Sequence, residues 1–360
     1  MLKATLHRSA GPAVLLVLLA FSLALAPAAD TTPQFDSIPG FEGNAGWLNG
    51  PPLTASDLHG KVVLVDFWEY TCINCLRTLP YLRTWYERYK DDGLVIVGVH
   101  TPEFGFSGES ANVAAAVKQL NVTWPVVLDS KSAVWDRYKV DEWPKEYLFD
   151  QNGHLVDTVS GEGWYPQTEA KIQALLKSAN PKLTFPPVMQ LLAQDSYLKP
   201  GAVCYLHTPE VIIQHTRVAN FAGFNDQLRD ATFTDLAATH KDGEIYLKGD
   251  WRITPEAVVA VGSPDYLAMR YHAIQVVGVL APPPGRTIRV NVTQDGQPVP
   301  KADAGSDIQY DDKGASYISV DASRAYDLVM NAKFGQHELR LAPDGNGIGV
   351  YSFAFEACEQ

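Results

Sequence analysis

The stretch from Lys61 to Pro80, KVVLVDFWEYTCINCLRTLP, constrains the fold more than any other part of the sequence. An apolar run that begins at Val62 leads to two cysteines at C-x-x-C spacing, Cys72 and Cys75. The run predicts a buried strand, and the helical periodicity of the residues after the cysteines predicts a helix. Two thiols where a strand passes into a helix can form a short, accessible disulfide, and the positive end of the helix favours a thiolate at the first sulfur. The sequence therefore predicts thiol–disulfide exchange at this pair.

Two other interpretations of the cysteine pair are open. A zinc site needs two further ligands at metal-like spacing, but Cys204 and Cys358 lie far apart and the nine histidines show no paired spacing. A permanent structural disulfide would instead make the chain a binding or scaffold protein. The predicted strand and helix on either side of the pair favour the redox-active interpretation. We expect neither a metal nor a cofactor.

The amino-terminal segment, residues 1–29, is expected to be a cleaved signal peptide. Two basic residues precede an apolar run at 13–25, and small residues at 26–29 offer a cleavage site. The apolar run is shorter than the roughly 20 residues that a membrane span needs, and an uncleaved anchor is the alternative. We therefore expect the protein to be periplasmic or secreted, in a compartment where disulfides persist.

The composition is that of a globular protein with more than one domain. The chain has 360 residues, of which 46% are hydrophobic and 19% charged, and this suffices for two packed cores. Its formal net charge is -12, and no cluster of basic residues offsets it. An acidic chain of this kind argues against nucleic-acid binding.

Two different patterns divide the chain after an extended lead-in at 30–59, which could include a short strand pair. In residues 60–180 strands alternate with helices, which predicts a sheet with helices on both faces. Residues 181–200 are predicted to be a linker with at most a short helical segment. Residues 201–360 hold many short β-type runs separated by turn signals, which predicts an all-β sandwich of the jelly-roll or carbohydrate-binding-module type.

The individual elements follow from these patterns. Pro80 lies inside the first predicted helix and is expected to kink or restart it. The elements predicted for the first domain are strands at 62–67, 94–99, 125–128, 147–149 and 155–160, and helices at 74–90, 109–120, 131–138 and 166–178. The strands predicted for the second domain are 203–206, 211–215, 244–247, 257–261, 266–271, 274–280, 287–293, 317–320, 326–331, 337–341 and 349–355.

The four cysteines allow three pairings. Because Cys72 and Cys75 are neighbours in the sequence, Cys204 and Cys358 are left to form one structural disulfide, between the first and the last β-type run of the second domain. Two free or intermolecular thiols are the alternative. Closing so long a loop would stabilise the domain by ~3–5 kcal/mol in the chain-entropy model.

Several segments resemble the thioredoxin superfamily. The series VDFW, C-x-x-C and a following proline carries this resemblance, together with Trp143-Pro144 ahead of the apolar run 147–149. The segments WEYTCINCLRTLPYL, GVHTPEFGF and WPKEYLFDQNGHL are similar to exported TlpA-like proteins and, more closely, to the periplasmic C-terminal part of DipZ-type thiol–disulfide interchange proteins. The resemblance extends from about Gly46 to the C-terminus and is weaker after Pro200.

The resemblance implies a thioredoxin fold and a role for each residue at the dithiol. Cys72 corresponds to the attacking thiol and Cys75 to the resolving thiol, which releases the substrate from a mixed disulfide. Pro144, preceded by Trp143, falls where the superfamily places a cis-proline beside the dithiol. An ordinary trans turn is the alternative for this proline.

Two acidic residues are candidates for moving the proton of the resolving thiol. Asp66 corresponds to the buried acid beneath the dithiol of thioredoxins, with a merely structural carboxylate as the alternative, and Glu69 is the second candidate. His100, which follows a predicted strand, could also lie beside the dithiol, and Trp164 could contact the substrate. A loop histidine and a packed aromatic are the alternatives for these two residues.

The residues around the cysteines depart from thioredoxin. Thr71 stands where thioredoxin has tryptophan, and Ile73-Asn74 replaces Gly-Pro, so the reducing or oxidising direction is left open. A thiol peroxidase would have threonine three residues before its cysteine, where this chain has Glu69. Such a peroxidase is therefore a further alternative.

The expected substrates are protein thiols and disulfides. DipZ-type proteins usually carry a membrane electron-transfer domain ahead of the part that this chain resembles, so a separate membrane or periplasmic redox partner is expected. For the second domain a glycan or a protein ligand is considered, because Trp251, Tyr266, Tyr271 and Tyr310 could form a sugar platform. Aromatics of the core are the alternative.

Overall fold

The computed structural model describes residues 35–214, 218–219 and 229–359. The predicted signal peptide lies outside these residues. All described residues belong to one unit of the chain. Within it, the α/β part (residues 35–200) forms a six-stranded sheet, and the β part (from 201 onward) forms a ten-stranded sheet and a two-stranded one.

The elements of the α/β part follow one another as strand–helix units. In chain order they are β1 (Trp47–Leu48), α1 (Ala55–Leu58), β2 (Val62–Trp68), α2 (Ile73–Tyr89), η1 (Lys90–Asp92), β3 (Leu94–His100), η2 (Gly105–Gly108), α3 (Ser110–Gln119), β4 (Val126–Leu128), α4 (Ala133–Tyr138), β5 (Lys145–Phe149), β6 (Leu155–Ser160) and α5 (Tyr165–Ala179). The strand order of the sheet is β1-β4-β3-β2-β5-β6. Strands β2, β3 and β4 are parallel because α2 and α3 return the chain between them, whereas β5 and β6 pair antiparallel.

Every strand and helix predicted for residues 60–180 is present, with ends that shift by at most two residues. Pro80, predicted to kink or restart the helix, lies inside the single helix α2. A proline here removes one hydrogen bond, which its N–H would have given to the carbonyl of Leu76. The neighbours Leu79, Tyr81 and Leu82 are buried, and their packing compensates for that loss.

The lead-in departs from its predicted extended form, since Ala55–Leu58 is a short helix. The reason is a capping box, T-x-x-D: the N–H of Thr54 donates to Asp57 Oδ2 at 2.8 Å, and the N–H of Asp57 donates to Thr54 Oγ1 at 3.4 Å. Instead of a strand pair, the lead-in adds the two-residue strand β1 to the edge of the sheet, antiparallel to β4.

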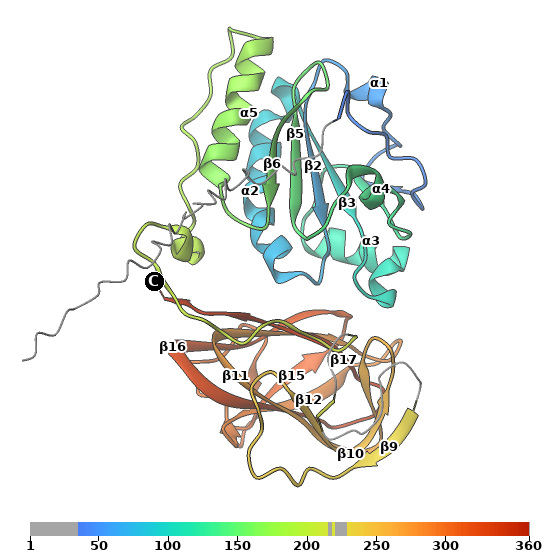
Figure 1. The fold of residues 1–360 in the computed structure, drawn as a ribbon, viewed down its shortest axis with the longest axis vertical. Coiled ribbons are helices and arrows are strands. Elements are labelled where there is room, and N and C mark those ends of the chain that lie inside the picture. The colour runs from blue at the N-terminus through green and yellow to red at the C-terminus, as the bar shows by residue number, and fades with distance from the viewer. Residues whose placement is uncertain (1–34, 215–217, 220–228, 360) are drawn as a thin grey trace, which may run out of the picture. The chain divides into compact units, whose positions relative to one another are not determined.

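Each face of this sheet is covered by its own apolar core. Residues at even positions of β2, such as Leu64 and Trp68, face the core formed with α2, α3 and α5. Residues at odd positions, such as Val65, face the lead-in and α4. Figure 1 shows α2 and α5 on one side of the sheet and α4 on the other. Since side chains alternate along a strand, Asp66 must point to the face that α2 covers.

Residues 181–200, predicted to be a linker, are packed against the α/β part. Their apolar side chains join the core that faces α2. The segment contains a short 3₁₀ helix, η3 (Ala193–Leu198), in which Asp195 is fully buried. The hydroxyl of Tyr81 on α2 donates to Asp195 Oδ2 at 2.5 Å. The segment is therefore fastened along α2.

The β part is built from antiparallel strands. In chain order they are β7 (Val203–Cys204), β8 (Val211–Ile212), β9 (Arg229–Phe233), β10 (Ile245–Ile253), β11 (Val258–Ala281), β12 (Ile288–Gln294), β13 (Gln297–Pro298), β14 (Gln309–Tyr310), β15 (Ser316–Val320), β16 (Arg324–Pro343), β17 (Gly349–Glu356) and β18 (Cys358–Glu359). The main order is β14-β15-β12-β16-β11-β10-β9, with β17 joined to β11 and β8 joined to β17. One apolar core gathers side chains from β8 to β17, so this part is an all-β domain, as the sequence predicts.

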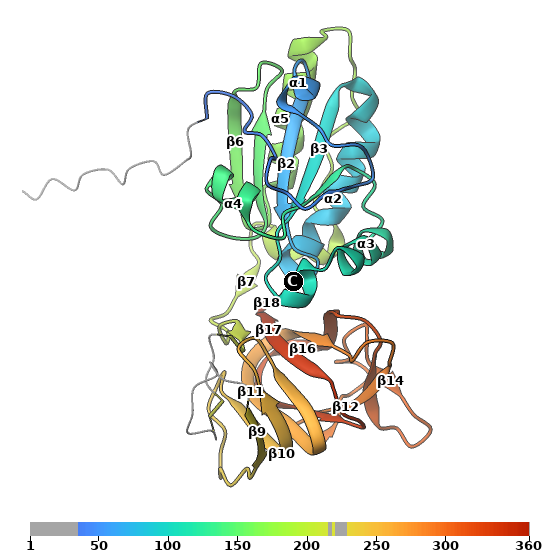
Figure 2. The same cartoon turned by 90° about the vertical axis from the view of Figure 1, so that its right-hand side faces the viewer.

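Two long strands replace several short strands that the sequence predicts. Three predicted runs between 257 and 280 form the single strand β11, and two between 326 and 341 form β16. The two strands lie side by side and bend along their length (Figures 1 and 2). The ladder between β10 and β11 shifts its register where Gly249 pairs with Pro264, so neither residue ends its strand.

The aromatic residues considered as a sugar platform do not form one. Trp251 and Tyr271 are fully buried in the core of the β part. The hydroxyl of Tyr310 donates to the carbonyl of Val299 at 2.7 Å. That expectation is wrong, because the alternation of β10 and β11 turns these two large rings inward.

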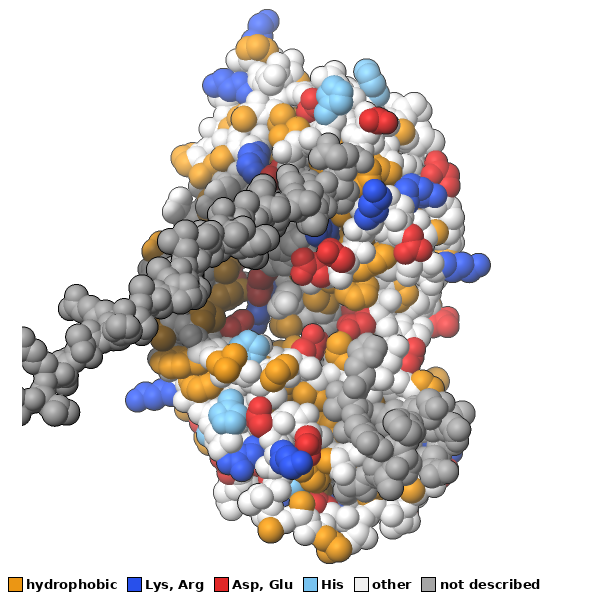
Figure 3. All heavy atoms as spheres, viewed as in Figure 1, with side chains coloured by type: hydrophobic (Ala, Val, Ile, Leu, Met, Phe, Trp, Pro, Cys, Tyr) orange, Lys and Arg blue, Asp and Glu red, His pale blue; other side chains and the backbone are white. Residues whose placement is uncertain are grey.

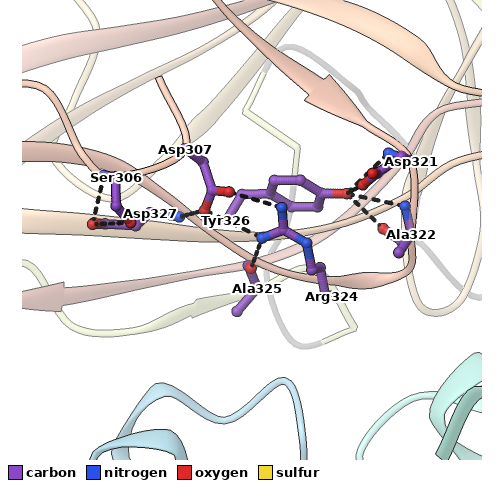
Figure 4. A network of polar contacts seen from close by, with 8 residues as sticks. All are labelled: Ser306, Asp307, Asp321, Ala322, Arg324, Ala325, Tyr326 and Asp327. Atoms are coloured by element: carbon purple, nitrogen blue, oxygen red, sulfur yellow. Dashed lines mark hydrogen bonds and ion pairs between the residues drawn. The ribbon is translucent and has the colours of Figure 1, made fainter. Parts of the chain in front are cut away.

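A polar network fixes the start of β16 (Figure 4). Arg324 Nη2 donates to Asp307 Oδ1 at 2.7 Å, and its guanidinium lies 3.8 Å from the centre of the Tyr326 ring. The Tyr326 hydroxyl donates to the carbonyl of Ala322 at 2.7 Å. Asp327 in turn accepts a hydrogen bond from the backbone N–H of Ser306 at 2.9 Å. These contacts fasten the loop before β16 to the strand.

The disulfide predicted between Cys204 and Cys358 is present. It joins β7 to β18, which also pair with each other in an antiparallel ladder. The bond closes a loop with a sequence separation of 154 residues. The two ends of the β part are therefore linked covalently.

The surface carries charges of both signs. On the face drawn in Figure 3, acidic and basic side chains are interspersed, with apolar side chains between them. Throughout the part of the chain that the structure describes, no helix is both long and apolar enough to cross a membrane.

Candidate active site

The two cysteines of the C-x-x-C motif occupy different environments at the start of α2. Cys72 is the N-cap residue of the helix and is partly exposed, whereas Cys75, one turn further on, is fully buried. The N–H of Cys75 donates to Cys72 Sγ at 3.4 Å. Both are free thiols. The helix N-terminus thus directs an N–H group at the outer sulfur, and such a terminus stabilises negative charge.

The inner thiol is held in its protonated form. Burial raises the pKa of Cys75 well above its usual value, and the hydrogen bond and charge at Cys72 and the charge of Asp66 act in the same direction. The two sulfurs therefore differ in access, and burial disfavours the thiolate form of Cys75. Because a thiolate is the reacting form, Cys72 is the sulfur that can attack a substrate from outside.

A pair of buried carboxyl groups lies on the sheet face that α2 covers. Asp66 and Glu146 are partners across β2 and β5, so their side chains share one face of the sheet. Both are buried, and Asp66 has no hydrogen-bond partner for either oxygen among the described residues. Burial raises the pKa of Asp66 to about 7, and burial followed by the charge of Asp66 raises that of Glu146. Burial of the two neighbouring carboxyl groups thus disfavours the ionisation of both.

Sequence reasoning identified Asp66 but missed Glu146. The available signal was local: Glu146 stands two residues after Pro144, directly before the aromatic and apolar residues of its strand, Tyr147 to Phe149. Its proximity to Asp66 depends on the register between β5 and β2, which residue spacing does not specify.

Asp66→Asn is expected to change how stability depends on pH. In the unfolded chain the aspartate has an ordinary pKa of about 3.9. Between about pH 4 and 7 the unfolded chain has lost this proton while the folded protein still holds it, so the free energy of unfolding falls as pH rises through this range. The variant lacks this loss and is expected to be more stable than the wild type at pH 8 by about 4 kcal/mol, with near-equal stability at pH 4.

Denaturant unfolding of the reduced protein from pH 4 to pH 8 measures this difference. Asp91→Asn, at an exposed position, is the control and should keep the wild-type profile. Parallel profiles for Asp66→Asn and wild type would show that Asp66 is ionised normally in the folded protein.

Glu69 holds the loop that precedes the dithiol. Its Oε2 accepts hydrogen bonds from the N–H of Thr71, at 2.6 Å, and from the Thr71 hydroxyl. Its carbonyl accepts from the N–H of Cys72 at 3.2 Å. His100 is buried 3.7 Å from Glu69 Oε1 and stacks on Tyr70. Glu69 and His100 therefore support the loop, and neither lines the cavity in front of Cys72.

Pro144 follows a cis peptide bond with Trp143, the geometry that the resemblance implied. Trp143 packs against Trp135, with 4.4 Å between ring centres, and it lines the cavity in front of Cys72. The carbonyl of Pro144 accepts a hydrogen bond from the N–H of Gly161 at 2.9 Å. Trp164 does not line this cavity; its side chain is exposed.

A cavity of about 470 Å³ opens on Cys72. One wall comes from the α/β part, including Thr71 and Trp143, and the other comes from β8, β11 and β17 of the β part. Arg77 bridges the two walls, since its Nη1 lies 3.1 Å from Glu162 and 3.1 Å from Glu356. Among the described residues, no three His, Cys, Asp or Glu side chains gather as metal ligands would.

The fold and the dithiol place the α/β part in the thioredoxin-like class. Residues 35–158 match the sequence profile of the AhpC/TSA family, and residues 208–355 match the profile described as "Thioredoxin like C-terminal domain". Each match covers less than half of the chain, and the two lie one after the other along it.

Among known proteins, the chain is similar to Protein DipZ of Mycobacterium tuberculosis and of Mycobacterium bovis, at 34% identity over 337 residues. The match covers 92% of this chain but 45% of DipZ, so the chain spans less than half the length of these relatives. Thiol-disulfide oxidoreductase ResA of Bacillus cereus is 29% identical over 134 residues, which is 37% of this chain and 72% of ResA. Among solved structures, the chain is similar to the solution structure of a thioredoxin-like protein in the oxidized form, at 26% identity and a TM-score of 0.37. The match covers 41% of this chain and 98% of the chain in that structure.

Proposed function

We propose that this protein is an exported thiol–disulfide oxidoreductase that exchanges disulfides with protein substrates. The observation that carries the proposal is the asymmetry of the dithiol at the start of α2. Cys72 Sγ accepts a hydrogen bond from a helix N-terminus and lines a cavity, while Cys75 is fully buried one turn behind it. One sulfur can therefore meet a substrate, and the other can meet only the first sulfur.

The chemistry runs in two exchanges. The Cys72 thiolate attacks one sulfur of a substrate disulfide, and the other substrate sulfur leaves as a thiolate. Cys75 then loses its proton and attacks Cys72 Sγ, which releases the second substrate thiolate and leaves a Cys72–Cys75 disulfide. Two electrons pass from the protein to the substrate, and the reverse sequence oxidises a substrate dithiol.

The groups around the dithiol support these steps in the proposal. Cys75 must be deprotonated inside the protein, and Asp66 on the same face is the base that can accept its proton. Trp143 lines the cavity in front of Cys72, so a substrate strand can bind beside it. Glu69 positions Thr71 and the N–H of Cys72.

Location and partner are part of the same proposal. The signal-peptide pattern of residues 1–29 and the structural disulfide support export to the periplasm or outside the cell. A membrane or periplasmic redox protein would return electrons to the Cys72–Cys75 disulfide, or remove them from the dithiol. The name of the similar ResA, a thiol-disulfide oxidoreductase, supports this class of activity.

Cys75→Ala is expected to trap a covalent complex with a protein substrate. The variant can still form the mixed disulfide through Cys72, but nothing resolves it. Model proteins with intact disulfides are incubated with the pre-reduced variant, and non-reducing electrophoresis with mass spectrometry detects the complex. Cys72→Ala in the same assay is the matched control and should form no complex. Absence of any trapped complex, together with no exchange by the wild type, would refute the proposal.

The reduction potential separates exchange from a structural bridge. If the Cys72–Cys75 couple is catalytic, its reduction potential is expected to lie above about -300 mV, because structural disulfides have potentials below that value.

The match to the AhpC/TSA family favours a second candidate function, a thiol peroxidase that uses the same cysteine. The carboxylate of Glu69 stands where that pattern has a hydroxyl, so the purified protein is expected to consume peroxide no faster than Cys72→Ala does.

A further inference from the structure

The β part presents an unusual sheet face to the dithiol. Along β11 and β17, Val276, Leu280 and Phe353 point into the core of the β part. Val277 and Val279 alternate with them and must point to the opposite face. An outer sheet face is normally polar, yet these two valines are 4% and 5% exposed without belonging to that core.

This outer face forms one wall of the cavity in front of Cys72. Val277 pairs with Ala354 and Val279 pairs with Ser352, and Ser352 pairs in turn with Ile212 of β8. All five side chains line the cavity together with Cys72. The reactive sulfur therefore faces an apolar strip three strands wide, which is suited to the side chain beside a substrate cysteine.

The charge around this strip is acidic. Five glutamates line the cavity, and His207 is the single basic side chain among its lining residues. Arg77 pairs with two of the five, Glu162 and Glu356. For Glu103 and Glu210 no hydrogen bond or ion pair occurs within the described residues. Burial, together with the charges of Glu210 and Glu69, raises the pKa of Glu103 to about 8. A cation beside Glu103 would relieve this repulsion.

We propose that this cavity binds the cysteine-bearing segment of a protein substrate, with an apolar side chain against Val277 and Val279 and a lysine or arginine side chain beside Glu103 and Glu210. The inference rests on the proposed thiol–disulfide exchange at Cys72 and names the substrates that the site selects. The cavity unites a reactive sulfur, an apolar wall and two acidic side chains without a cationic partner. A basic, partly apolar peptide complements all three, because a bound cation favours the ionised form of both acids. The β part thus supplies the specificity for chemistry that occurs on the α/β part.

Two peptide disulfides that differ only in flanking charge test the proposal. One has the sequence Lys-Cys-Val-Lys and the other Glu-Cys-Val-Glu, and each is joined through its cysteine to 5-thio-2-nitrobenzoate. The Cys72 thiolate attacks the peptide sulfur, the coloured thiolate leaves, and Cys75 then displaces the peptide thiol. The second-order rate constant of colour release by the reduced wild-type protein is expected to be on the order of tenfold higher for the lysine peptide at low salt, and this ratio should shrink as salt is added.

The ratio of the two rate constants is then measured in variants. The double variant Glu103→Gln with Glu210→Gln is expected to bring the ratio close to one. Glu109→Gln, an exposed glutamate outside the cavity lining, is the matched control and should keep the wild-type ratio. The ratio compares two substrates on the same protein sample, so partial loss of folded protein does not alter it. Val277→Ser should lower the rate with both valine-containing peptides and leave the charge ratio in place.

The outcomes separate the two levels of the proposal. A wild-type ratio near one, or a ratio that the double glutamine variant leaves unchanged, overturns the basic-substrate inference while exchange itself stands. No reaction with either peptide or with uncharged hydroxyethyl disulfide overturns the proposed function instead.

Discussion

Cys72→Ala is expected to abolish thiol–disulfide exchange, with a loss in rate on the order of 10⁴-fold or more. Cys72 carries the sulfur that lines the cavity, whereas Cys75 is fully buried and burial raises its pKa well above the usual value. The inner thiol can therefore neither reach a substrate nor ionise readily in place of the outer one. Reduction of hydroxyethyl disulfide by the pre-reduced protein measures the effect.

The loss has to come from chemistry and not from unfolding. Cys72 is partly exposed, so its replacement by alanine should shift the thermal midpoint little. Cys75→Ala provides the contrast, because that variant still completes the first exchange and accumulates the mixed disulfide. If Cys72→Ala kept its exchange rate while Cys75→Ala lost the first exchange, the order of attack assigned to the two sulfurs would be reversed.

The double variant Cys204→Ser with Cys358→Ser is expected to destabilise the β part by about 4–5 kcal/mol. The disulfide closes a loop with a sequence separation of 154 residues, and its removal restores conformational entropy to the unfolded chain. Each of β7 and β18 has two residues, so few backbone hydrogen bonds remain to hold the ends together. Hydrogen exchange of the backbone amides of β11 and β16 at increasing denaturant measures the change.

The α/β part provides an internal control for the disulfide variant. Its dithiol is distinct from Cys204 and Cys358, so exchange with hydroxyethyl disulfide should persist below the unfolding transition. An unchanged denaturation midpoint in the double variant would mean that the ladder between β7 and β18 already restrains the ends without the covalent bond.

Much of the α/β fold could be predicted because local and long-range signals agree there. Strand β2 is buried at all seven positions, and the sequence shows it as an apolar run. The first turn of α2 begins at the cysteine pair, where the resemblance places it. Helix α1 was missed because a capping box of four residues has little weight beside the surrounding Gly and Pro residues. The two cysteines of the site and the cis-proline beside them were also identified in advance.

The rest of the site depends on pairing between distant strands. The run around Val277 is apolar at successive positions, so alternation in the sequence cannot distinguish the core face from the face that lines the cavity. Glu146 acquires its role only through its register with Asp66. Similarly, Gly249 and Pro264 fall outside the predicted strands, but the ladder includes them at register shifts because their neighbours gain more by burial in one continuous sheet.

The path of residues 181–200 decides where the α/β part can be cut as an independent piece. The apolar side chains of this segment cover α2, and its residue Asp195 accepts the hydrogen bond from the Tyr81 hydroxyl. A fragment ending at 180 would leave that hydroxyl without its acceptor and expose an apolar strip along the very helix that begins with the dithiol. A chain boundary placed by composition would thus fall inside the folded body, and the smallest self-contained redox fragment extends past Leu198.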